Sequence, residues 1–594
     1  MAASPLDNSE GPVRVVVTSE GSPVPDAAEL ISVTVRRSIN QVPRTTLVFA
    51  DGDMPEQKFP LSDGAHFKPG AAIVIKAGYG DSETQIFSGI VVRHGLSIAG
   101  GNDSRLVVEC RDKAVKMTVG RKNTQHIDKT DADVISLLIK GHGLAATVSD
   151  AAIVHPELIQ HYCTDWDFML ARAEANGCLV VVHDGSVTVG APKSSGAAVL
   201  EVGYGTSLID FQADVDAHHQ YTSVQASAWA MKDQAPLLGA DQPPATLGAQ
   251  GNLDSKTLAK VLGLAKLALQ TGAPLPKPAL DGWAKAQQLK SGLSRLRGHM
   301  RFQGSALAQV GALIDLKGVG ERFNGLVFVT GLTHQIEQGA WTTEVEFGAP
   351  PEWFTERSDV MAPAAAGLVP GIEGLHVGVV LKLDADPGGE YRVQVKVPAA
   401  GVESVWARLL QFYASSAFGA FFAPEVGDEV LLGWFNNDPG FPVVLGSLYS
   451  SKRAPPTPLS AKNEIKAIVT RCKAKLEFND EDKVITLLTP GNNRMVFSDK
   501  DKSIVITDQN NNKVELGPDG ITLDSPKNIK ISAKGTVTVD AVGAVTISSK
   551  ADVKVEGLNV NCNAKVGLVA KGTASAELSA SGQTTVKGAM VMIN

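Results

Sequence analysis

The chain has 594 residues, a formal net charge of −8 at pH 7, 44% hydrophobic residues and five cysteines. This length exceeds what one hydrophobic core supports, so about three or four domains are expected. The small negative charge argues against a nucleic-acid partner. The cysteines form no C-x-x-C pair, which favours free thiols in a reducing compartment over a disulfide framework.

The sequence predicts neither a signal peptide nor a membrane-spanning helix. Residues 1–11 contain no basic stretch followed by an apolar one, so no signal peptide is expected. Apolar runs stay well short of the roughly 18 residues that a spanning helix needs. We therefore expect synthesis and assembly in the cytoplasm, and a route other than general secretion if the protein acts outside the cell.

The N-terminal region alternates apolar and polar residues in short runs. Such runs separated by Gly and Pro turns over 13–110 predict an antiparallel barrel or sandwich. Apolar residues at helical spacing then predict short helices at 131–140 and 165–175. Thr164 or Asp165 is suited to cap the second helix at its N-terminus.

The segment 232–282 is rich in Ala, Pro, Gln and Gly. Within it, 254–270 places its apolar residues on one side and predicts an amphipathic helix, and a second helix is expected at about 281–297. We interpret the part near 232–300 as a helical insertion in the region 1–360. It either packs on its own domain, the favoured interpretation, or forms an interaction arm.

A Pro- and Ala-rich linker is predicted at 361–371. Beyond it, 372–450 contains about five short strand patterns, the size of a small five-stranded barrel of the OB type. The segment 451–483 includes a Pro-rich joint and is predicted to connect this barrel to the repeats that follow.

From 484 the chain becomes repetitive. Paired apolar residues recur about every ten residues, and from Ile521 every eight, with one step of seven before Val560. A fixed period is typical of a solenoid. One octad supplies a strand, a turn and two apolar side chains, which cannot enclose a core in one chain. We therefore expect three chains to build an intertwined triple-stranded β-helix over 484–594; the alternative is a monomeric β-meander or a low-complexity tail.

About ten octads stacked roughly 4.8 Å apart would give a rod on the order of 50 Å long. The predicted fold class is thus mainly β with minor α: barrels, an OB-fold and a C-terminal needle in a homotrimer. The residues predicted to form the trimer core are Ile529, Ile531, Val537, Val539, Val545, Ile547, Val553 and Val555.

Three blocks of sequence carry a resemblance to a known family. They are Gln160-x-Tyr162-x-x-Asp165-Trp166-x-Phe168 with Arg172-Ala-Glu-Ala-Asn-Gly177; Gly318-Val-Gly-Glu-Arg-Phe-Asn-Gly325 with His334 and Trp341; and Pro424-Glu-Val-Gly-Asp-Glu-Val430 with Pro442-Val-Val-Leu-Gly-Ser447. With these blocks in order, the chain resembles VgrG-type spike proteins of contractile injection systems, which fuse a baseplate hub to a tail spike. Its ending is similar to that of the extracellular, phage-tail-like branch.

The resemblance implies a structural, non-enzymatic function. Such a spike links a hexameric inner tube and baseplate proteins to a tip protein with a Pro-Ala-Ala-Arg (PAAR) repeat, and it contacts a target membrane transiently when the sheath contracts. The particle is released or acts outside the cell, with toxin cargo as a further partner left open. The implied seat of the tip is Gly588, Ala589, Met590, Val591, Met592, Ile593 and Asn594. The alternatives are a type VI secretion spike that exports effectors and a cargo- or enzyme-bearing spike.

No residue pattern predicts catalysis, a metal site or a cofactor. Only about 450–484 separates the small barrel from the repeats, too little for a catalytic insertion. The candidates considered and set aside are His155 with His161, His183, His218-His219, Gly318-x-Gly320, Ser415-Ser416 and the charge run Asp480-Glu481-Asp482.

Overall fold

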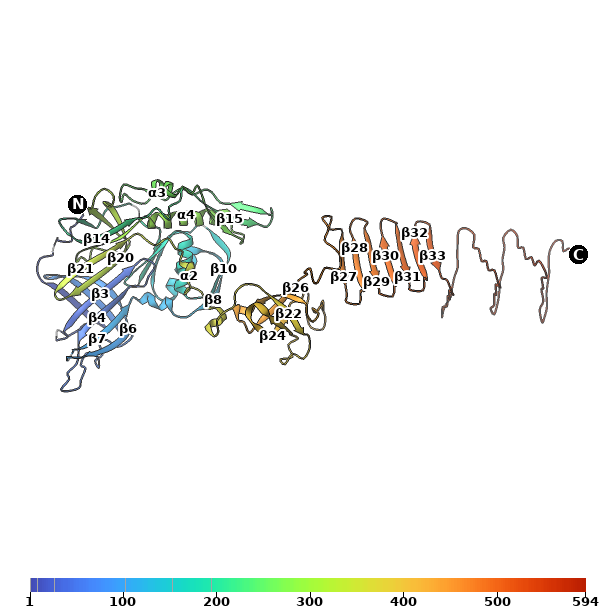
Figure 1. The fold of residues 1–594 in the computed structure, drawn as a ribbon, viewed down its shortest axis with the longest axis horizontal. Helices are drawn as coiled ribbons and strands as arrows, with labels where there is room; N and C mark the ends of the chain where they lie inside the picture. Colours follow the sequence, from blue (N-terminus) through green and yellow to red (C-terminus); the bar gives the residue numbers. More distant parts are fainter. Residues whose placement is uncertain are drawn as a thin grey trace. The chain divides into compact units, whose positions relative to one another are not determined.

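The computed structural model describes residues 2–7, 9–25, 27–101, 103–151, 153–193 and 195–593. It divides into two compact units, Met1–Leu448 and Tyr449–Asn594. Strands far outnumber helices in both (Figure 1), which confirms the prediction of a mainly β protein with minor α.

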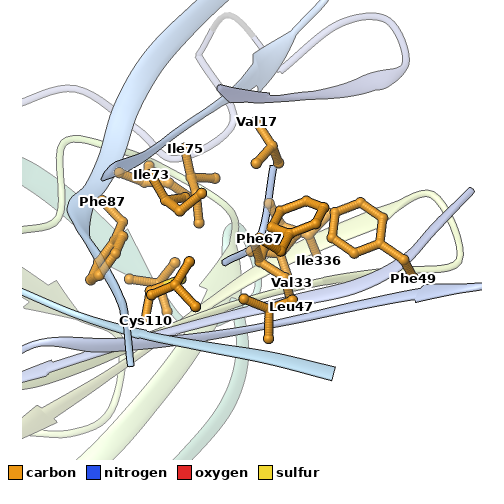
Figure 2. Packing of buried hydrophobic residues seen from close by; sticks show 14 of the residues in the cluster. Val17, Val33, Leu47, Phe49, Phe67, Ile73, Ile75, Phe87, Cys110 and Ile336 are labelled. Carbon is orange, nitrogen blue, oxygen red and sulfur yellow. The ribbon is translucent and has the colours of Figure 1, made fainter. Parts of the chain in front are cut away.

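The N-terminal strands are antiparallel, as predicted, and belong to one large sheet. They are β1 (Val13–Ser19), β2 (Ser22–Pro23), β3 (Leu30–Ser38), β4 (Arg44–Ala50), β5 (Ala72–Tyr79), β6 (Ser82–Ala99) and β7 (Asp103–Arg111). Their inward side chains form one buried cluster, in which the rings of Phe49 and Phe67 lie 4.8 Å apart (Figure 2). Ile336, from a strand more than two hundred residues later, packs into the same cluster.

That later strand belongs to a second group of strands. The group comprises β13 (Leu200–Gly203), β14 (Leu208–Val215), β18 (Leu296–Gln303), β19 (Leu313–Lys317), β20 (Gly325–Glu337) and β21 (Ala340–Phe347). Strand β20 pairs antiparallel with β3, from Gly331 opposite Ser38 to Glu337 opposite Ser32. The two groups of strands therefore share one thirteen-stranded sheet.

A pair of helices with small sheets lies between these groups in sequence. Its elements are η1 (Lys113–Thr118), β8 (Lys122–Thr130), α1 (Asp131–Gly141), β9 (Ala145–Val148), β10 (Val154–Cys163), α2 (Asp165–Ala175), β11 (Leu179–His183) and β12 (Ser186–Gly190). Both helices were predicted within one residue of these bounds. The N-cap of α2 is Thr164, whose hydroxyl accepts a hydrogen bond from the Asp167 backbone N–H.

The inserted region contains β15 (Val224–Ala230), β16 (Ala235–Leu238), α3 (Ser255–Leu262), β17 (Leu267–Thr271) and α4 (Lys277–Ser294). The prediction of one helix over 254–270 is wrong. Helix α3 ends at Leu262 because Gly263 adopts a left-handed conformation (φ 67°) that terminates helices. The residues that follow form β17, which pairs parallel with β15. Helix α4 begins at Lys277, earlier than predicted, with a proline in its first turn.

The predicted five-stranded barrel is present. After η2 (Phe354–Glu356) and η3 (Ala364–Gly367), it comprises β22 (His376–Lys382), β23 (Val393–Val397), η4 (Pro398–Ala400), β24 (Val402–Leu409), β25 (Glu429–Trp434), η5 (Phe435–Asn437) and β26 (Pro442–Ser447). The barrel closes in the order β22-β23-β24-β26-β25 around a small core rich in valine.

The second unit begins with one antiparallel sheet of seven consecutive strands (Figure 1). They are β27 (Ile465–Val469), β28 (Lys475–Asn479), β29 (Val484–Leu488), β30 (Arg494–Ser498), β31 (Ser503–Thr507), β32 (Lys513–Gly517) and β33 (Gly520–Asp524). The sheet starts inside the segment expected to be a connector. From 525 to 593 the chain winds on as an open coil, with no strand assigned over those residues.

Over the described ranges, each helix is too short or too polar to cross a bilayer.

Candidate assembly interfaces

The seven-stranded sheet has one almost wholly apolar face. In an antiparallel sheet, residues opposite one another share a face. Two neighbouring rows of such residues cross the sheet on this face. The first row begins at Ile468 and is apolar throughout. The second begins at Lys466, which is its single polar residue. The apolar sheet face, as the term is used below, consists of Ile468, Leu476, Phe478, Ile485, Leu487, Met495, Phe497, Ile504, Ile506, Val514, Leu516, Ile521 and Leu523.

The opposite face is more polar, although Val484, Leu488, Val496 and Val505 also lie on it. It carries Thr486 between Glu477 and Val496 on the neighbouring strands. Ion pairs run along it, with 2.8 Å between Lys475 Nζ and Glu477 Oε2 and 2.6 Å between Lys513 Nζ and Glu515 Oε2. This sheet is therefore amphipathic, as expected of one layer of a larger assembly.

Nothing within one described chain covers the apolar sheet face. Its side chains remain open to solvent, with Ile468 48% exposed and Leu487 43% exposed. One row of them, from Ile468 to Ile506, lines part of a groove of about 620 Å³. Each of the five buried hydrophobic clusters found among the described residues lies before residue 449. Soluble proteins rarely leave so large an apolar surface uncovered, so this face requires a partner.

The octads beyond the sheet continue the same pattern without intrachain strand pairing. The eight residues predicted to form the trimer core are more than half exposed, from 55% for Val537 and Val545 to 78% for Ile547. One chain thus leaves them in solvent, and their burial between chains stays a prediction.

The predicted seat of the tip protein is also exposed. Gly588, Ala589, Met590, Val591, Met592 and Ile593 all lie open to solvent. Asn594, the remaining member of that set, lies outside the described residues. Tip binding stays a prediction.

The motif that carries the hub resemblance forms a buried polar network between α1 and α2. Asp131, the first residue of α1, accepts hydrogen bonds from Arg172 (2.6 and 2.9 Å), from the Asn176 side chain (2.8 Å) and from His155 (3.0 Å). Asp165, the first residue of α2, is the corresponding acceptor for the other helix.

The Asp165 carboxylate accepts hydrogen bonds from Lys122 (2.5 Å), His142 (2.7 Å) and Gln160 (3.0 Å). Burial by itself raises the pKa of both aspartates, but the donors around each one outweigh it and hold the pKa below its ordinary value. Asp131, His142 and Lys122 were not singled out in the sequence. Asp131 and His142 lie at the ends of a predicted helix and Lys122 begins a strand, and charged residues at such positions could have been chosen as candidates.

The residues set aside as catalytic candidates are dispersed. His155 donates to the Asp131 carboxylate, His183 Nδ1 lies 3.3 Å from Asp184, and His161 is exposed. The rings of His218 and His219 pack against each other at 4.8 Å. Across the described ranges, no group of three or more His, Cys, Asp or Glu side chains is arranged to hold a metal ion.

The other candidates have structural roles. Asp480 pairs with Lys466, and Glu481 and Asp482 pair with Lys462 and Lys500 at 2.8 Å each. Gly318 and Gly320 adopt positive φ (76° and 81°) in the turn before β20. Ser415 lies in a hairpin of the small barrel, where its backbone N–H bonds the Phe418 carbonyl.

Comparison with known families decides what kind of protein this is. Residues 9–338, more than half of the chain, match the family described as the Alg8 N-terminal domain. The chain belongs to the Alg8 N-terminal domain family. Residues 376–449, which contain the closed barrel β22–β26, match the type VI secretion system/phage-baseplate injector OB domain. The prediction of a VgrG-type spike protein is confirmed, and the chain is a structural spike-baseplate protein.

Several solved structures are similar to parts of this chain at low sequence identity. The 43 kDa tail protein of prophage MuSo2 from Shewanella oneidensis is 11% identical, with a TM-score of 0.43 over 57% of this chain and 98% of that chain. The E. coli c3393 protein, a type VI secretion component, is 12% identical, with a TM-score of 0.38 over 73% and 99%. The Francisella PdpA–VgrG complex is 8% identical, with a TM-score of 0.38 over 86% and 80%.

Proposed function

We propose that this VgrG-type protein is the homotrimeric central spike of a contractile injection machine. It joins a hexameric inner tube and baseplate proteins to a PAAR-repeat tip protein, and it punctures the target membrane when the sheath contracts. Its contribution is stiffness and shape, without bond chemistry of its own.

The apolar sheet face is the observation that carries the proposal. Three copies with these faces turned inward form the walls of a prism, and the polar faces remain in water. Covering a half-exposed Leu, Ile or Phe stabilises by roughly 1 kcal/mol. With eleven such side chains in each copy, and Met495 and Val514 beside them, trimer formation is strongly favoured.

The segment after β33 argues for three copies over two. Two sheets could cover each other face to face, but the octads from Ile529 onward supply only one strand and one turn each. Because β33 is an edge strand of its sheet, the backbone beyond it needs partners from other chains. Three chains winding around one axis satisfy that backbone and bury the paired apolar residues. The resulting rod has no free edge, which makes it stiff.

Mass measurement on the purified chain, with two matched variants, tests this proposal. We expect a particle of three times 62.4 kDa that resists SDS without heating. Leu487→Asp places a charge on the apolar sheet face and should leave monomers, whereas Thr486→Asp, one residue away on the polar face, should leave trimers. A stable folded monomer or dimer of the unmodified chain contradicts the proposal.

The setting proposed for the spike is the extracellular, phage-tail-like branch. The residues from Glu577 to Asn594 resemble those of spikes of that branch, whereas the OB-domain match covers type VI secretion as well. Fractionation of cells that make the protein separates the two. Cell-free particles that contain sheath, tube and this chain support the extracellular setting. A spike found only with a cell-envelope complex supports type VI secretion.

A purified trimer that hydrolyses peptidoglycan, with the activity lost on changing one residue, would favour an enzyme-bearing spike. We expect no hydrolysis.

A further inference from the structure

The loop between β24 and β25 of the small barrel displays five aromatic side chains to solvent. Phe412 and Phe421 are each 85% exposed, and Tyr413, Phe418 and Phe422 are each more than half exposed. The segment 410–424 that contains them has no charged residue. Below it is called the aromatic hairpin.

Several contacts hold the aromatic hairpin in one conformation. Ala414 and Gly419 form an antiparallel bridge, and the Ala420 N–H donates to the Tyr413 carbonyl at 2.8 Å. Gly419 has φ +143°, and a Cβ there would lie 2.6 Å from the Tyr413 carbonyl oxygen, so only glycine fits.

Side-chain contacts also hold the aromatic hairpin in this conformation. The Gln411 amide brackets the backbone of Phe422, to whose carbonyl it donates at 3.1 Å and from whose N–H it accepts at 3.4 Å. The rings of Phe412 and Phe422 stack with centroids 6.5 Å apart. An ordered loop loses little conformational entropy on binding, so these exposed rings are prepared to dock.

The exposed aromatic area matches that of a protein interface. Each aromatic side chain can bury about 150–250 Å². At the exposures above, five of them present on the order of 600 Å², more than the largest apolar patch of most monomers. A stable interface takes about 800 Å² from each partner. The aromatic hairpin therefore supplies most of one side of an interface.

The absence of charged residues from the aromatic hairpin favours a protein partner over a membrane surface. Segments that dock on membrane surfaces combine apolar residues with Lys or Arg that meet anionic headgroups. The sequence from Leu410 to Pro424 contains neither. An uncharged aromatic surface of this size is suited to another protein surface of the same kind.

We propose that the aromatic hairpin of one copy packs against the small barrel of a second copy of this chain, as a trimer contact separate from the needle. This inference rests on the proposed trimer. Segment 449–464 joins the barrel to β27 and spans at most about 55 Å when fully extended. A needle that gathers three copies therefore holds three barrels at high local concentration, where a modest contact is sufficient.

Photocrosslinking in the full-length protein tests the inference. The photoreactive residue p-benzoylphenylalanine replaces Phe421 in one preparation. In the control it replaces Tyr391, which is 93% exposed on the same barrel but outside the hairpin. After irradiation we expect the Phe421 preparation to yield covalently linked copies on a denaturing gel, and the Tyr391 preparation to remain single chains.

The other outcomes overturn the inference. A particle of three times the chain mass without Phe421 crosslinks removes the barrel contact and leaves the trimer proposal standing. Crosslinks to lipid when phosphatidylcholine–phosphatidylserine vesicles are present, in place of crosslinks between copies, assign the hairpin to a membrane. A chain that is monomeric by mass contradicts the proposed function itself, and the inference falls with it.

A variant pair gives a second measurement. Phe412→Ser with Phe421→Ser should keep the trimer mass, because the needle is unchanged, while the melting temperature of the barrel region falls by several degrees. Tyr391→Ser should leave that melting temperature unchanged. Equal melting temperatures for all three proteins would contradict the barrel contact.

Discussion

His142 Nε2 and the Asp165 carboxylate lie 2.7 Å apart, and their hydrogen bond joins the C-cap of α1 to the first residue of α2. The reverse contact is present as well, since Asn176, the C-cap of α2, donates to Asp131, the first residue of α1, at 2.8 Å. A helix N-terminus favours a negative charge. Each aspartate is therefore stabilised by the N-terminus of its own helix and by the C-cap side chain of the other helix.

Replacing Asp165 should destabilise the helix pair. In Asp165→Asn the buried position loses its charge, so Lys122 and His142 lose the charged acceptor that they share. Because the Lys122 side chain is half exposed, the cost is mainly that of the lost hydrogen bonds, about 1–3 kcal/mol. The thermal unfolding transition of the region before the small barrel should move to lower temperature. Asp128→Asn, an exposed residue on β8, is the control and should leave the transition in place. Equal effects of the two changes would contradict the role assigned to Asp165.

His334 makes the same region sensitive to mild acid. Burial, with a smaller effect of the nearby Arg37 charge, lowers the pKa of His334 to about 3. The ring is fully buried beside Thr343 and stays neutral in the folded protein. In the unfolded chain it takes up a proton near its ordinary pKa of about 6.5. Stability is therefore present above that pH and is lost as the pH falls below it.

A comparison with His334→Gln isolates this contribution. Between pH 7 and pH 5.5 the wild-type protein should lose about 1 kcal/mol more unfolding free energy than the variant, which has no proton to bind at this position. Urea titrations at the two pH values measure the difference. Parallel losses in the two proteins would show that His334 does not contribute to the acid sensitivity.

The needle prediction has its own matched pair of variants. Val545→Asp places three carboxylates on the axis of one layer, where each unpaired buried charge costs several kcal/mol. Trimers should fail to form. Thr546→Asp points the same charge outward, because successive residues of a strand face opposite sides, and should still form trimers. Size-exclusion chromatography with light scattering measures both. A trimeric Val545→Asp protein would mean that Val545 does not face the axis.

The end of the needle should bind the tip protein without contributing to trimer formation. Deletion of 588–594 removes the exposed apolar residues Met590, Val591, Met592 and Ile593. We expect the deletion variant to retain the trimer mass and to lose at least tenfold in affinity for a PAAR-repeat protein, measured by calorimetry. Unchanged affinity would locate the tip site elsewhere.

Local patterns in the sequence were sufficient for much of the fold. Helices α1 and α2 follow from apolar spacing and from Thr164 as a cap, since both depend on neighbouring residues. The closed barrel and the repeats follow from strand spacing in the same way. The helix predicted over 254–270 failed because pairing of β17 with β15, a contact between distant segments, overrode helical periodicity.

Other features were decided only by tertiary structure. The sharing of one sheet through β20 and β3, and the network around Asp131 and Asp165, join residues far apart in sequence. The register of β27–β33 aligned scattered apolar pairs into one continuous face, and it placed the start of the sheet at Ile465. By itself the sequence determined the octad period, and burial of the octads between chains is predicted from it because eight residues cannot enclose a core. The apolar sheet face emerged only when the strands were paired, because opposite residues share a face only in a defined register.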